Sequence, residues 1–239
     1  MQYLKIKQTI VDQIDSGLLL AGQKLPTERK FAELFSTTRV TLREALSLLE
    51  AEGKIYREDR RGWFVSPQPL RYDLGKMASF TEMTIEQNRT PNIQLISAKK
   101  ELASHQASLL LQLKPFSDCY SIEQLHLVEN RPVAFVINYI KSELFSNLLS
   151  CDLTTSLADI LVHDYAVIQH QSQFRVSSTS LFGNIAQALR ATPGTSATQI
   201  ERINYNKDQQ IINCAIEYWR HDAICIESQV MRNDSKNYN

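Results

Sequence analysis

The chain has 239 residues, with 26 basic and 26 acidic side chains and 43% hydrophobic residues. This composition is ordinary for a globular protein and is sufficient for two small domains or one large domain. No apolar run approaches the roughly 20 residues that cross a bilayer, and the first residues lack the apolar stretch of a secretory signal, so we expect a cytoplasmic protein without membrane contact.

Three helices are predicted within the first 53 residues. The first covers residues 3–16, where isoleucine recurs at every fourth position, as on one face of an amphipathic helix. Thr27 is a suitable N-cap for a short second helix. The third helix follows the polar residues 36–38 and ends at Gly53. Its apolar side chains share one face at helical spacing and are Leu42, Ala45, Leu46 and Leu49.

A short β-hairpin is predicted next, with strands at residues 55–57 and 63–65. Its tip carries Arg60, Arg61 and Gly62, which we expect to meet the DNA backbone or the minor groove. Two short helices, a tight turn and a hairpin with a basic tip are typical of a winged helix-turn-helix. The sequence therefore predicts an N-terminal DNA-binding domain.

Arg39 and Arg43 lie four positions apart and share the face of the third helix opposite the leucines. Arginine forms paired hydrogen bonds with guanine or phosphate, and the flanking hydroxyls of Thr38 and Thr41 suit phosphates. The alternative is that both arginines are merely solvated. The first 70 residues hold 11 basic and 9 acidic side chains, too small an excess to decide. The turn and the basic hairpin tip favour DNA binding.

Pro67 and Pro69 disfavour continuation of either kind of element. We predict a DNA-binding domain at residues 1–67, a linker at 68–76 and a second domain at 77–235. Helices are expected at residues 104–111, 156–162 and 181–190. Strands are expected at residues 93–102, 120–127, 132–140, 167–178, 199–205, 211–218 and 223–230, the last closing the sheet. Because few strands are joined by long helices, this order predicts an α+β fold with an antiparallel sheet.

Several stretches of the first domain, Lys24–Arg29, Thr38–Leu46 and Leu49–Gly53, resemble the GntR family of bacterial regulators. The rest of the chain is similar to the HutC branch, whose effector-binding UTRA domain shares its fold with chorismate lyase. Arg60–Pro67 and Ile216–Asp222 resemble regulators of phosphonate utilisation, which are associated with 2-aminoethylphosphonate. The resemblance implies a homodimer on an inverted-repeat operator. It also implies that the residues in contact with the DNA include Arg29, Arg39, Arg43 and Gly62.

The UTRA resemblance implies an effector site at residues 79–81, where hydroxyls and amides bind an anion in relatives. It adds Ser156 at a helix N-terminus, where free N–H groups attract anions. Ser79 and Ser156 have an equally simple explanation as helix N-caps. The residues that we assign to the effector are Ser79, Phe80, Thr81, Gln124, His126, Ser156, Tyr218 and Arg220.

Many relatives carry Arg-x-Arg where this chain has Gln124-Leu125-His126. Two guanidinium groups bind a phosphate or phosphonate strongly, whereas glutamine and neutral histidine offer only uncharged hydrogen bonds. The effector is then less anionic, or another base substitutes, or the affinity is weak. The substitute bases are Arg175, Arg202 and Arg220. Arg220 has a simpler alternative as one half of a surface ion pair with Asp222.

An enzyme on the chorismate-lyase fold and a ligand-free architectural DNA-binding protein are the alternative classes. The four cysteines and five histidines are scattered without metal-ligand spacing. The sequence has no glycine-rich phosphate loop and no nucleophile elbow, so we expect no catalytic residue, metal or cofactor. An architectural protein has no need of a large second domain. A ligand-controlled repressor is favoured, with phosphonates, sugar phosphates and amino acids as effector classes.

Overall fold

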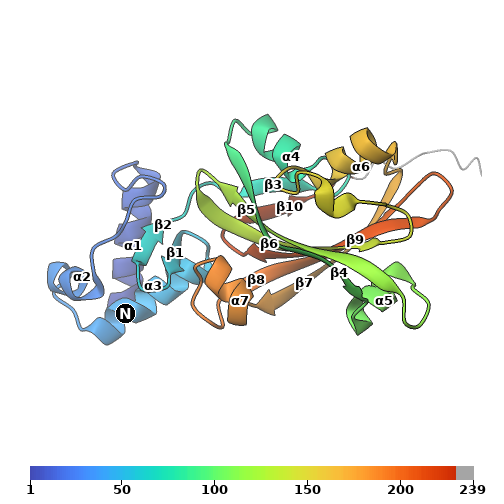
Figure 1. The fold of residues 1–239 in the computed structure, drawn as a ribbon. Coiled ribbons are helices and arrows are strands. Elements are labelled where there is room, and N and C mark those ends of the chain that lie inside the picture. Colours follow the sequence, from blue (N-terminus) through green and yellow to red (C-terminus); the bar gives the residue numbers. More distant parts are fainter. Residues whose placement is uncertain (230–239) are drawn as a thin grey trace, which may run out of the picture.

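A computed structural model describes residues 1–229 and shows a small helical domain beside a larger domain built on a β-sheet (Figure 1). The N-terminal elements are α1 (Gln2–Asp15), α2 (Glu28–Leu34), α3 (Arg39–Ala51), β1 (Ile55–Glu58) and β2 (Gly62–Val65). The C-terminal helices are α4 (Phe80–Glu86), α5 (His105–Leu111), the 3₁₀ helix η1 (Leu148–Ser150), α6 (Leu157–Tyr165) and α7 (Gly183–Ala188). The C-terminal strands are β3 (Leu70–Asp73), β4 (Pro91–Leu102), β5 (Asp118–Val128), β6 (Arg131–Lys141), β7 (Gln171–Ser180), β8 (Ser196–Tyr205), β9 (Ile211–Arg220) and β10 (Ile224–Glu227). Within residues 1–229 no helix is long and apolar enough to cross a membrane.

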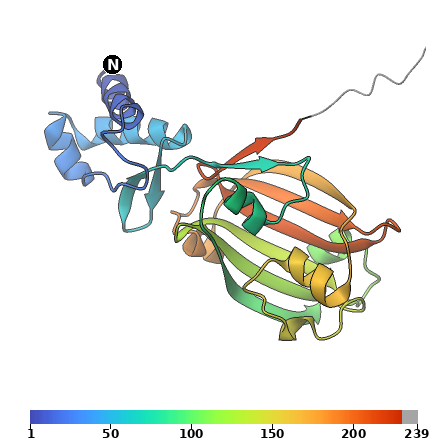
Figure 2. The ribbon, with the colours of Figure 1, turned by 90° about the horizontal axis from the view of Figure 1, so that it is seen from above.

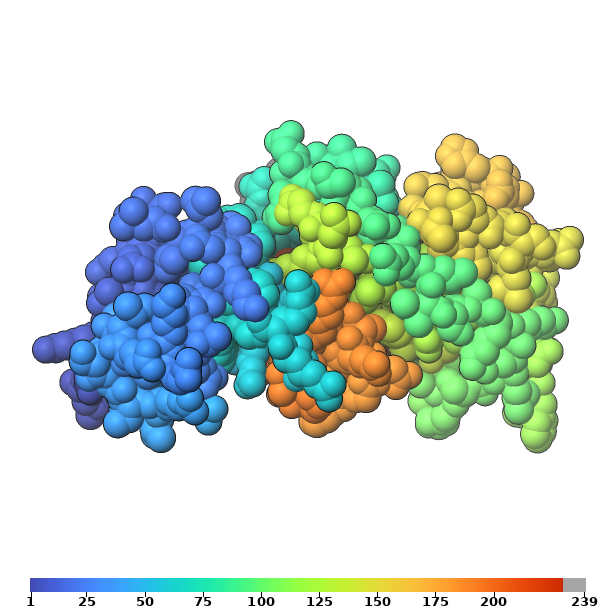
Figure 3. All heavy atoms as spheres, turned by 60° about the vertical axis from the view of Figure 1, so that its left-hand side comes forward, coloured from blue at the N-terminus to red at the C-terminus, as the bar shows by residue number. Residues whose placement is uncertain are grey.

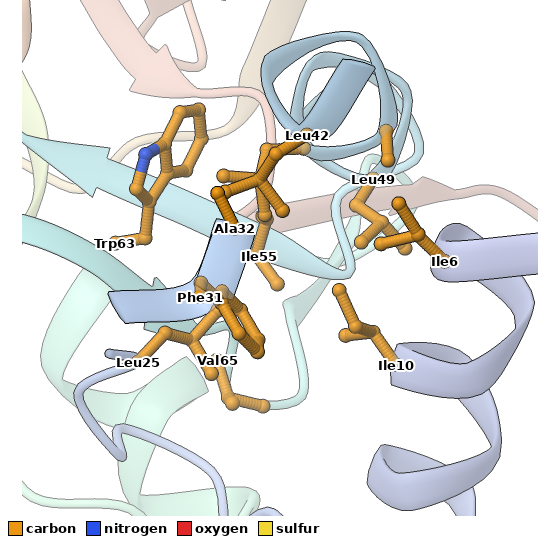
Figure 4. Close-up of a cluster of buried hydrophobic side chains, with 12 residues drawn as sticks. Ile6, Ile10, Leu25, Phe31, Ala32, Leu42, Leu49, Ile55, Trp63 and Val65 are labelled. Atoms are coloured by element: carbon orange, nitrogen blue, oxygen red, sulfur yellow. The ribbon is translucent and has the colours of Figure 1, made fainter. Parts of the chain in front are cut away.

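The N-terminal core forms because α1 and α3 turn their apolar faces toward each other (Figure 4). Ile10 of α1 shares a fully buried cluster with Leu42 and Leu49 of α3. The side chain of Thr38 caps α3 by accepting a hydrogen bond from the backbone N–H of Thr41 at 3.2 Å. These contacts confirm the predicted third helix and its buried face.

Strands β1 and β2 form the predicted hairpin, which pairs Ile55 with Val65 and Glu58 with Gly62. The turn between them needs a positive φ at two positions, Arg60 at 57° and Gly62 at 101°. Glycine adopts such a conformation without steric strain from a Cβ, which explains why Gly62 closes the turn. The hairpin is the wing of the predicted winged helix-turn-helix.

Six antiparallel strands form the main sheet in the order β4-β5-β6-β9-β8-β7. Helices α4 and α6 lie on one face of this sheet, and α5 and α7 lie on the other (Figure 1 and Figure 2). Because both faces are covered, the central strand β9 is buried along almost its whole length. Polar side chains on this strand therefore lie inside the domain, where they need partners.

Strand β10 does not join the main sheet, so the prediction that residues 223–230 close it is wrong. β10 pairs in parallel with β3, with Ile224 opposite Leu70. β3 also lies inside the segment predicted as the linker 68–76. Leu70 and Tyr72 alternate with more exposed neighbours and join Trp219 in one core cluster. The end predicted for the second domain, residue 235, lies outside the described residues, as does Val230.

Candidate functional site

The face of α3 opposite the core carries the two arginines singled out in the sequence. Arg39 and Arg43 are exposed, whereas Leu42 between them is fully buried. The hydroxyl oxygens of Thr38 and Thr41 lie 3.0 Å apart at the start of the helix. The exposed face therefore combines guanidinium and hydroxyl groups, which hydrogen-bond to bases and phosphates when a helix enters the major groove.

Glu28, at the start of α2, fixes the position of Arg43. Nε of Arg43 donates to Oε2 of Glu28 at 2.7 Å, and Nε1 of Trp63 donates to Oε1 at 3.3 Å. Burial raises the pKa of the Glu28 carboxyl, but the hydrogen bonds from Arg43 and Trp63 outweigh it and lower the pKa. The carboxylate is thus charged and holds the guanidinium from the neighbouring helix. Sequence reasoning missed Glu28, because only the packing of α2 on α3 brings the pair together.

The remaining basic side chains predicted for this surface are accessible. The side chain of Arg29 on α2 is 77% exposed, and that of Arg60 at the wing tip is 93% exposed. Arg61 forms an ion pair with the buried Glu58 of β1, yet its side chain is 55% exposed. Gly62 contributes its backbone conformation rather than a side chain. The exposed cations lie on α2, on α3 and on the wing.

The wing also contacts the C-terminal domain. Figure 3 shows the hairpin (cyan) against the segment around α7 (orange). The backbone N–H of Asp59 donates to the carbonyl oxygen of Arg190 at 2.9 Å. Nη2 of Arg220 donates to the carbonyl oxygen of Arg57 at 3.2 Å. Movement of the wing relative to the sheet therefore breaks specific hydrogen bonds.

A cluster of buried charged side chains lies next to this contact. Asp222 accepts hydrogen bonds from Arg131 and, at 3.3 Å, from Nε of Arg220. The Arg131 guanidinium lies 3.7 Å from the ring centroid of Tyr56 on β1. Burial raises the pKa of Asp222, but the two guanidinium groups outweigh it and lower the pKa. The ring of His221 bridges the same boundary, 2.7 Å from the carbonyl oxygen of Glu50 and 3.0 Å from that of Ser196.

A cavity of about 250 Å³ lies between the main sheet and the helices α4 and α6. Five of the predicted effector residues line it, namely Ser79, Phe80, Gln124, His126 and Ser156. The hydroxyl of Ser79 caps α4, and that of Ser156 caps α6, each by accepting a backbone N–H. The N-cap explanation therefore describes both serines, although both also border the cavity.

Three of the predicted effector residues do not line this cavity: Thr81, Tyr218 and Arg220. The physical reason for the last two is strand alternation, because successive residues of β9 point to opposite faces. Glu217 and Trp219 point toward the cavity, so their neighbours point away from it. Tyr218 packs in the cluster on the other face, and Arg220 belongs to the domain boundary. The Arg220–Asp222 pair is buried rather than on the surface.

Sequence reasoning missed Glu217, the buried acidic residue of the cavity, and named Arg202 only as one of three possible bases. Nη2 of Arg202 lies 3.3 Å from Oε1 of Glu217. Glu217 also accepts hydrogen bonds from Nε1 of Trp219 at 2.8 Å and from the Tyr72 hydroxyl at 3.4 Å. Burial, and then the charge of Glu217, raise the pKa of Tyr72, so this hydroxyl keeps its proton. Arg175 does not line the cavity, and its side chain is 81% exposed.

His126 faces the cavity as an uncharged ring. Its ring centroid lies 4.3 Å from that of Phe80, in a stacked arrangement. Burial, with a smaller contribution from the charge of Arg202, lowers the pKa of His126 to about 3. Within residues 1–229 neither ring nitrogen has a hydrogen-bond partner. Buried polar atoms without partners are rare in folded proteins, so the two nitrogens need a partner that the described residues do not supply.

Two family models match the chain. The bacterial regulatory proteins of the gntR family match residues 2–65, and the UTRA domain matches residues 86–224. The uncharacterized HTH-type transcriptional regulator YihL of Escherichia coli strain K12 is 30% identical over 220 residues, which are 91% of this chain and 93% of YihL. The HTH-type transcriptional repressor NagR of Bacillus subtilis strain 168 is 27% identical over 220 residues, which are 92% and 90% of the two chains.

The solved structures support the same architecture. The crystal structure of PhnF from Mycobacterium smegmatis is similar with a TM-score of 0.67 at 19% identity, covering 95% of this chain and 100% of that chain. This match shows a common fold for both domains. The matched families and relatives are transcriptional regulators and not enzymes. The chain therefore belongs to the GntR family of bacterial regulators and carries a UTRA domain after its helix-turn-helix.

Proposed function

We propose that the protein is a homodimeric repressor that binds an inverted-repeat operator and releases it when a small polar effector fills the cavity. The observation that carries the DNA-binding part is the exposed face of α3, where Arg39 and Arg43 lie opposite the buried core. An inverted repeat suits a dimer in which each copy reads one half-site. Repression follows where the bound dimer covers promoter DNA.

In this proposal α3 enters the major groove. Arg39 and Arg43 bind base edges, because a guanidinium forks onto guanine. The other contacts are to phosphates or to the groove beside the wing, where they fix the register of the domain. These residues are Arg29, Thr38, Thr41, Arg60, Arg61 and Gly62.

Replacement of Arg43 by alanine tests the DNA-binding part. A bidentate base contact contributes about 1–3 kcal/mol, so Arg43→Ala is expected to weaken operator binding about 5- to 150-fold and to affect unrelated DNA much less. The operator is first selected from fragments of the host genome, and affinities are measured by fluorescence anisotropy at one fixed salt concentration. Arg175→Ala, an exposed arginine of the C-terminal domain, is the control. Unchanged operator affinity in Arg43→Ala contradicts the proposal.

The effector part is tested by thermal unfolding with and without ligand. The resemblance to phosphonate regulators makes 2-aminoethylphosphonate the first candidate, with Arg202 as the base that meets the phosphonate. Sugar phosphates and amino acids are the other sequence-based candidates. A ligand at about 100-fold its dissociation constant stabilises the folded state by roughly 2.7 kcal/mol. A shift with 2-aminoethylphosphonate alone identifies a phosphonate sensor, and the same ligand must then release the operator.

A further inference from the structure

The cavity wall is polar but offers little positive charge to an anion. Within the described chain, Arg202 is the one arginine or lysine that lines it, and the guanidinium is already paired with Glu217 at 3.3 Å. Two more carboxylates, Glu82 and Asp159, line the cavity from α4 and α6. A buried anion needs compensating cations. A phosphate or phosphonate dianion would meet one guanidinium that is already paired with the buried Glu217, and two further carboxylates that are exposed.

The Arg202–Glu217 pair is also a fixed unit. Glu217 is only 3% exposed and accepts hydrogen bonds from Tyr72 and Trp219 in addition to Arg202. Release of Arg202 to clamp an anion would leave this carboxylate without its counter-charge, which is costly in a buried site. Nε of Arg202 is buried and has no partner within residues 1–229, so one N–H donor of the pair remains unsatisfied.

His126 selects for a group that both donates and accepts. Both of its ring nitrogens lack partners within the described residues, and the lowered pKa of the buried ring, about 3, keeps it neutral. A neutral imidazole has one N–H donor and one acceptor nitrogen. A dianionic phosphonate group only accepts, so in 2-aminoethylphosphonate only the ammonium could pair with the acceptor nitrogen. A hydroxyl group both donates and accepts, so it can pair with either ring nitrogen, whichever of them carries the proton.

The rest of the wall is consistent with the same chemistry. Asn138, Asn204 and Asn213 line the cavity from three adjacent strands, and an amide side chain also both donates and accepts. The rings of Phe80 and Trp219, with centroids 6.2 Å apart, offer apolar surface to carbon-bound hydrogens. The volume of about 250 Å³ lies below the roughly 300–1,000 Å³ of sites for drug-sized ligands, so the ligand is small.

We propose that the effector is an uncharged polyhydroxyl compound of monosaccharide size, held by His126, the Arg202–Glu217 pair and the asparagines, rather than a phosphate or phosphonate. This inference rests on the proposed function of the cavity as the effector site. It differs from the candidate that the sequence resemblance suggests, because Gln124 and His126 replace two cations by uncharged groups.

The test is a binding comparison between uncharged sugars and their phosphates. The full-length protein is screened by thermal unfolding at millimolar ligand with uncharged pentoses, hexoses and hexitols, with the matching phosphates and with 2-aminoethylphosphonate. Every compound that gives a shift is then titrated by calorimetry. We expect an uncharged compound to bind at least about tenfold more tightly than its own phosphate, because the phosphate leaves buried groups unsatisfied. Tighter binding of a phosphate or of 2-aminoethylphosphonate, or no shift with any uncharged compound, overturns the inference.

Two variants of His126 show whether the ring nitrogens are responsible. His126→Phe keeps an aromatic ring beside Phe80 but removes both nitrogens, and it is expected to bind the identified sugar at least about tenfold more weakly. His126→Asn keeps a donor and an acceptor and is expected to retain most of the affinity. Equal affinity of the wild type and His126→Phe contradicts the assignment.

Operator binding by the same preparations separates the two proposals. Thermal unfolding without ligand verifies that each variant is folded, and operator affinity verifies that the DNA-binding domain works. If the wild type binds no genomic fragment specifically, the proposed regulatory function fails whatever the sugars do. If an operator is bound and an anion releases it, the regulatory function stands and the inference of an uncharged effector fails.

Discussion

Gln124 and His126, the two polar residues of β5 that line the cavity, have different surroundings. Nε2 of Gln124 donates to the carbonyl oxygen of Leu153 at 2.8 Å, and so ties β5 to the loop that precedes α6. Nδ2 of Asn138 donates to Oε1 of Gln124 at 3.4 Å. His126 also lines the cavity, and its two buried ring nitrogens have no such partner within residues 1–229. Gln124 therefore supports the cavity wall, whereas His126 is the residue to which we assign the proposed contact with the effector.

The neutral state of His126 predicts a loss of stability in mild acid. The folded-state pKa, about 3, lies below the unfolded value of about 6.5, so the unfolded chain takes up a proton first as the pH falls below 6.5. Stability is complete above that pH and falls by about 1.4 kcal/mol per pH unit below it. His126→Asn lacks this proton, and at pH 5 the wild type should have lost about 2 kcal/mol more than the variant. Chemical denaturation between pH 5 and pH 7.5 measures the free energy of unfolding of both proteins. If the two free energies change with pH in parallel, His126 takes up its proton in the folded protein as readily as in the unfolded chain.

The contact between Glu28 and Arg43 predicts an effect on specificity rather than on charge alone. Glu28→Gln keeps the shape of the side chain but removes the charge that fixes Arg43 at 2.7 Å. We expect the ratio of operator to random-DNA affinity to fall about tenfold, because a base contact needs a fixed guanidinium. Glu33→Gln on the same helix removes the same charge from the looser pair with Arg29, at 3.9 Å, and should leave the ratio unchanged. If the ratio of operator to random-DNA affinity is the same in Glu28→Gln and Glu33→Gln, Glu28 acts only through its charge and does not position Arg43.

At the scale of elements, the sequence predicted those helices and strands whose hydrophobic pattern is set by neighbouring residues. The apolar face of α3 and the strands β5 and β6 could be predicted, because helix and strand periods are set within a few residues. The strand predicted at residues 211–218 is observed as β9. The effector residues predicted on β9, however, do not line the cavity. Tyr218 and Arg220 were selected by resemblance, whereas the period of two places Glu217 and Trp219 there.

Contacts between distant segments account for the rest. The inward direction of Arg202 depends on its pairing with Ala215 of β9, which no pattern within β8 encodes. The parallel pairing of β10 with β3 joins the two ends of the C-terminal domain. The Arg220–Asp222 pair is buried, and Arg220 donates to the backbone of the wing. In each of these cases, the sequence supplies the residue type and the tertiary packing supplies its partner.

The wing predicts a sequence-independent contribution to DNA binding. Arg60 is 93% exposed at the tip, and one phosphate contact changes the slope of log affinity against log salt by about 0.9. Arg60→Ala is therefore expected to weaken binding to operator and random DNA alike and to lower the slope by about one. Anisotropy titrations over a range of salt concentrations measure the slope. A slope equal to that of the wild type would remove Arg60 from the contacts.

At the scale of the whole molecule, β9 and the turn after it connect the two sites. Glu217 and Trp219 line the cavity, and Arg220 at the end of the strand donates to the backbone of β1 in the wing. Asp222 holds Arg220 and Arg131 together at the same boundary. A ligand that shifts the end of β9 therefore acts on the contacts that orient the wing. Coupling of this kind requires that the ligand bind the two domain arrangements with different affinity.

Asp222 is the residue whose loss should uncouple effector from operator. Asp222→Asn preserves the shape of the side chain but leaves Arg131 and Arg220 buried without a counter-charge, so the contact with the wing weakens. The effector identified by thermal unfolding should still bind, since Asp222 does not line the cavity. The ratio of operator affinities with and without effector, typically about 5–150-fold in allosteric proteins, should fall to less than about threefold.

The control is Asp208→Asn, which changes an exposed aspartate in the loop at the opposite end of β9 and should keep the coupling of the wild type. All measurements are made below the unfolding temperature of each variant, because removal of a buried partner also lowers stability by about 3–5 kcal/mol. Loss of coupling with retained effector binding would place signal transmission at the boundary between β9 and the wing. Retained coupling in folded Asp222→Asn would instead mean that the signal reaches the operator through another contact, such as the interface of the proposed dimer.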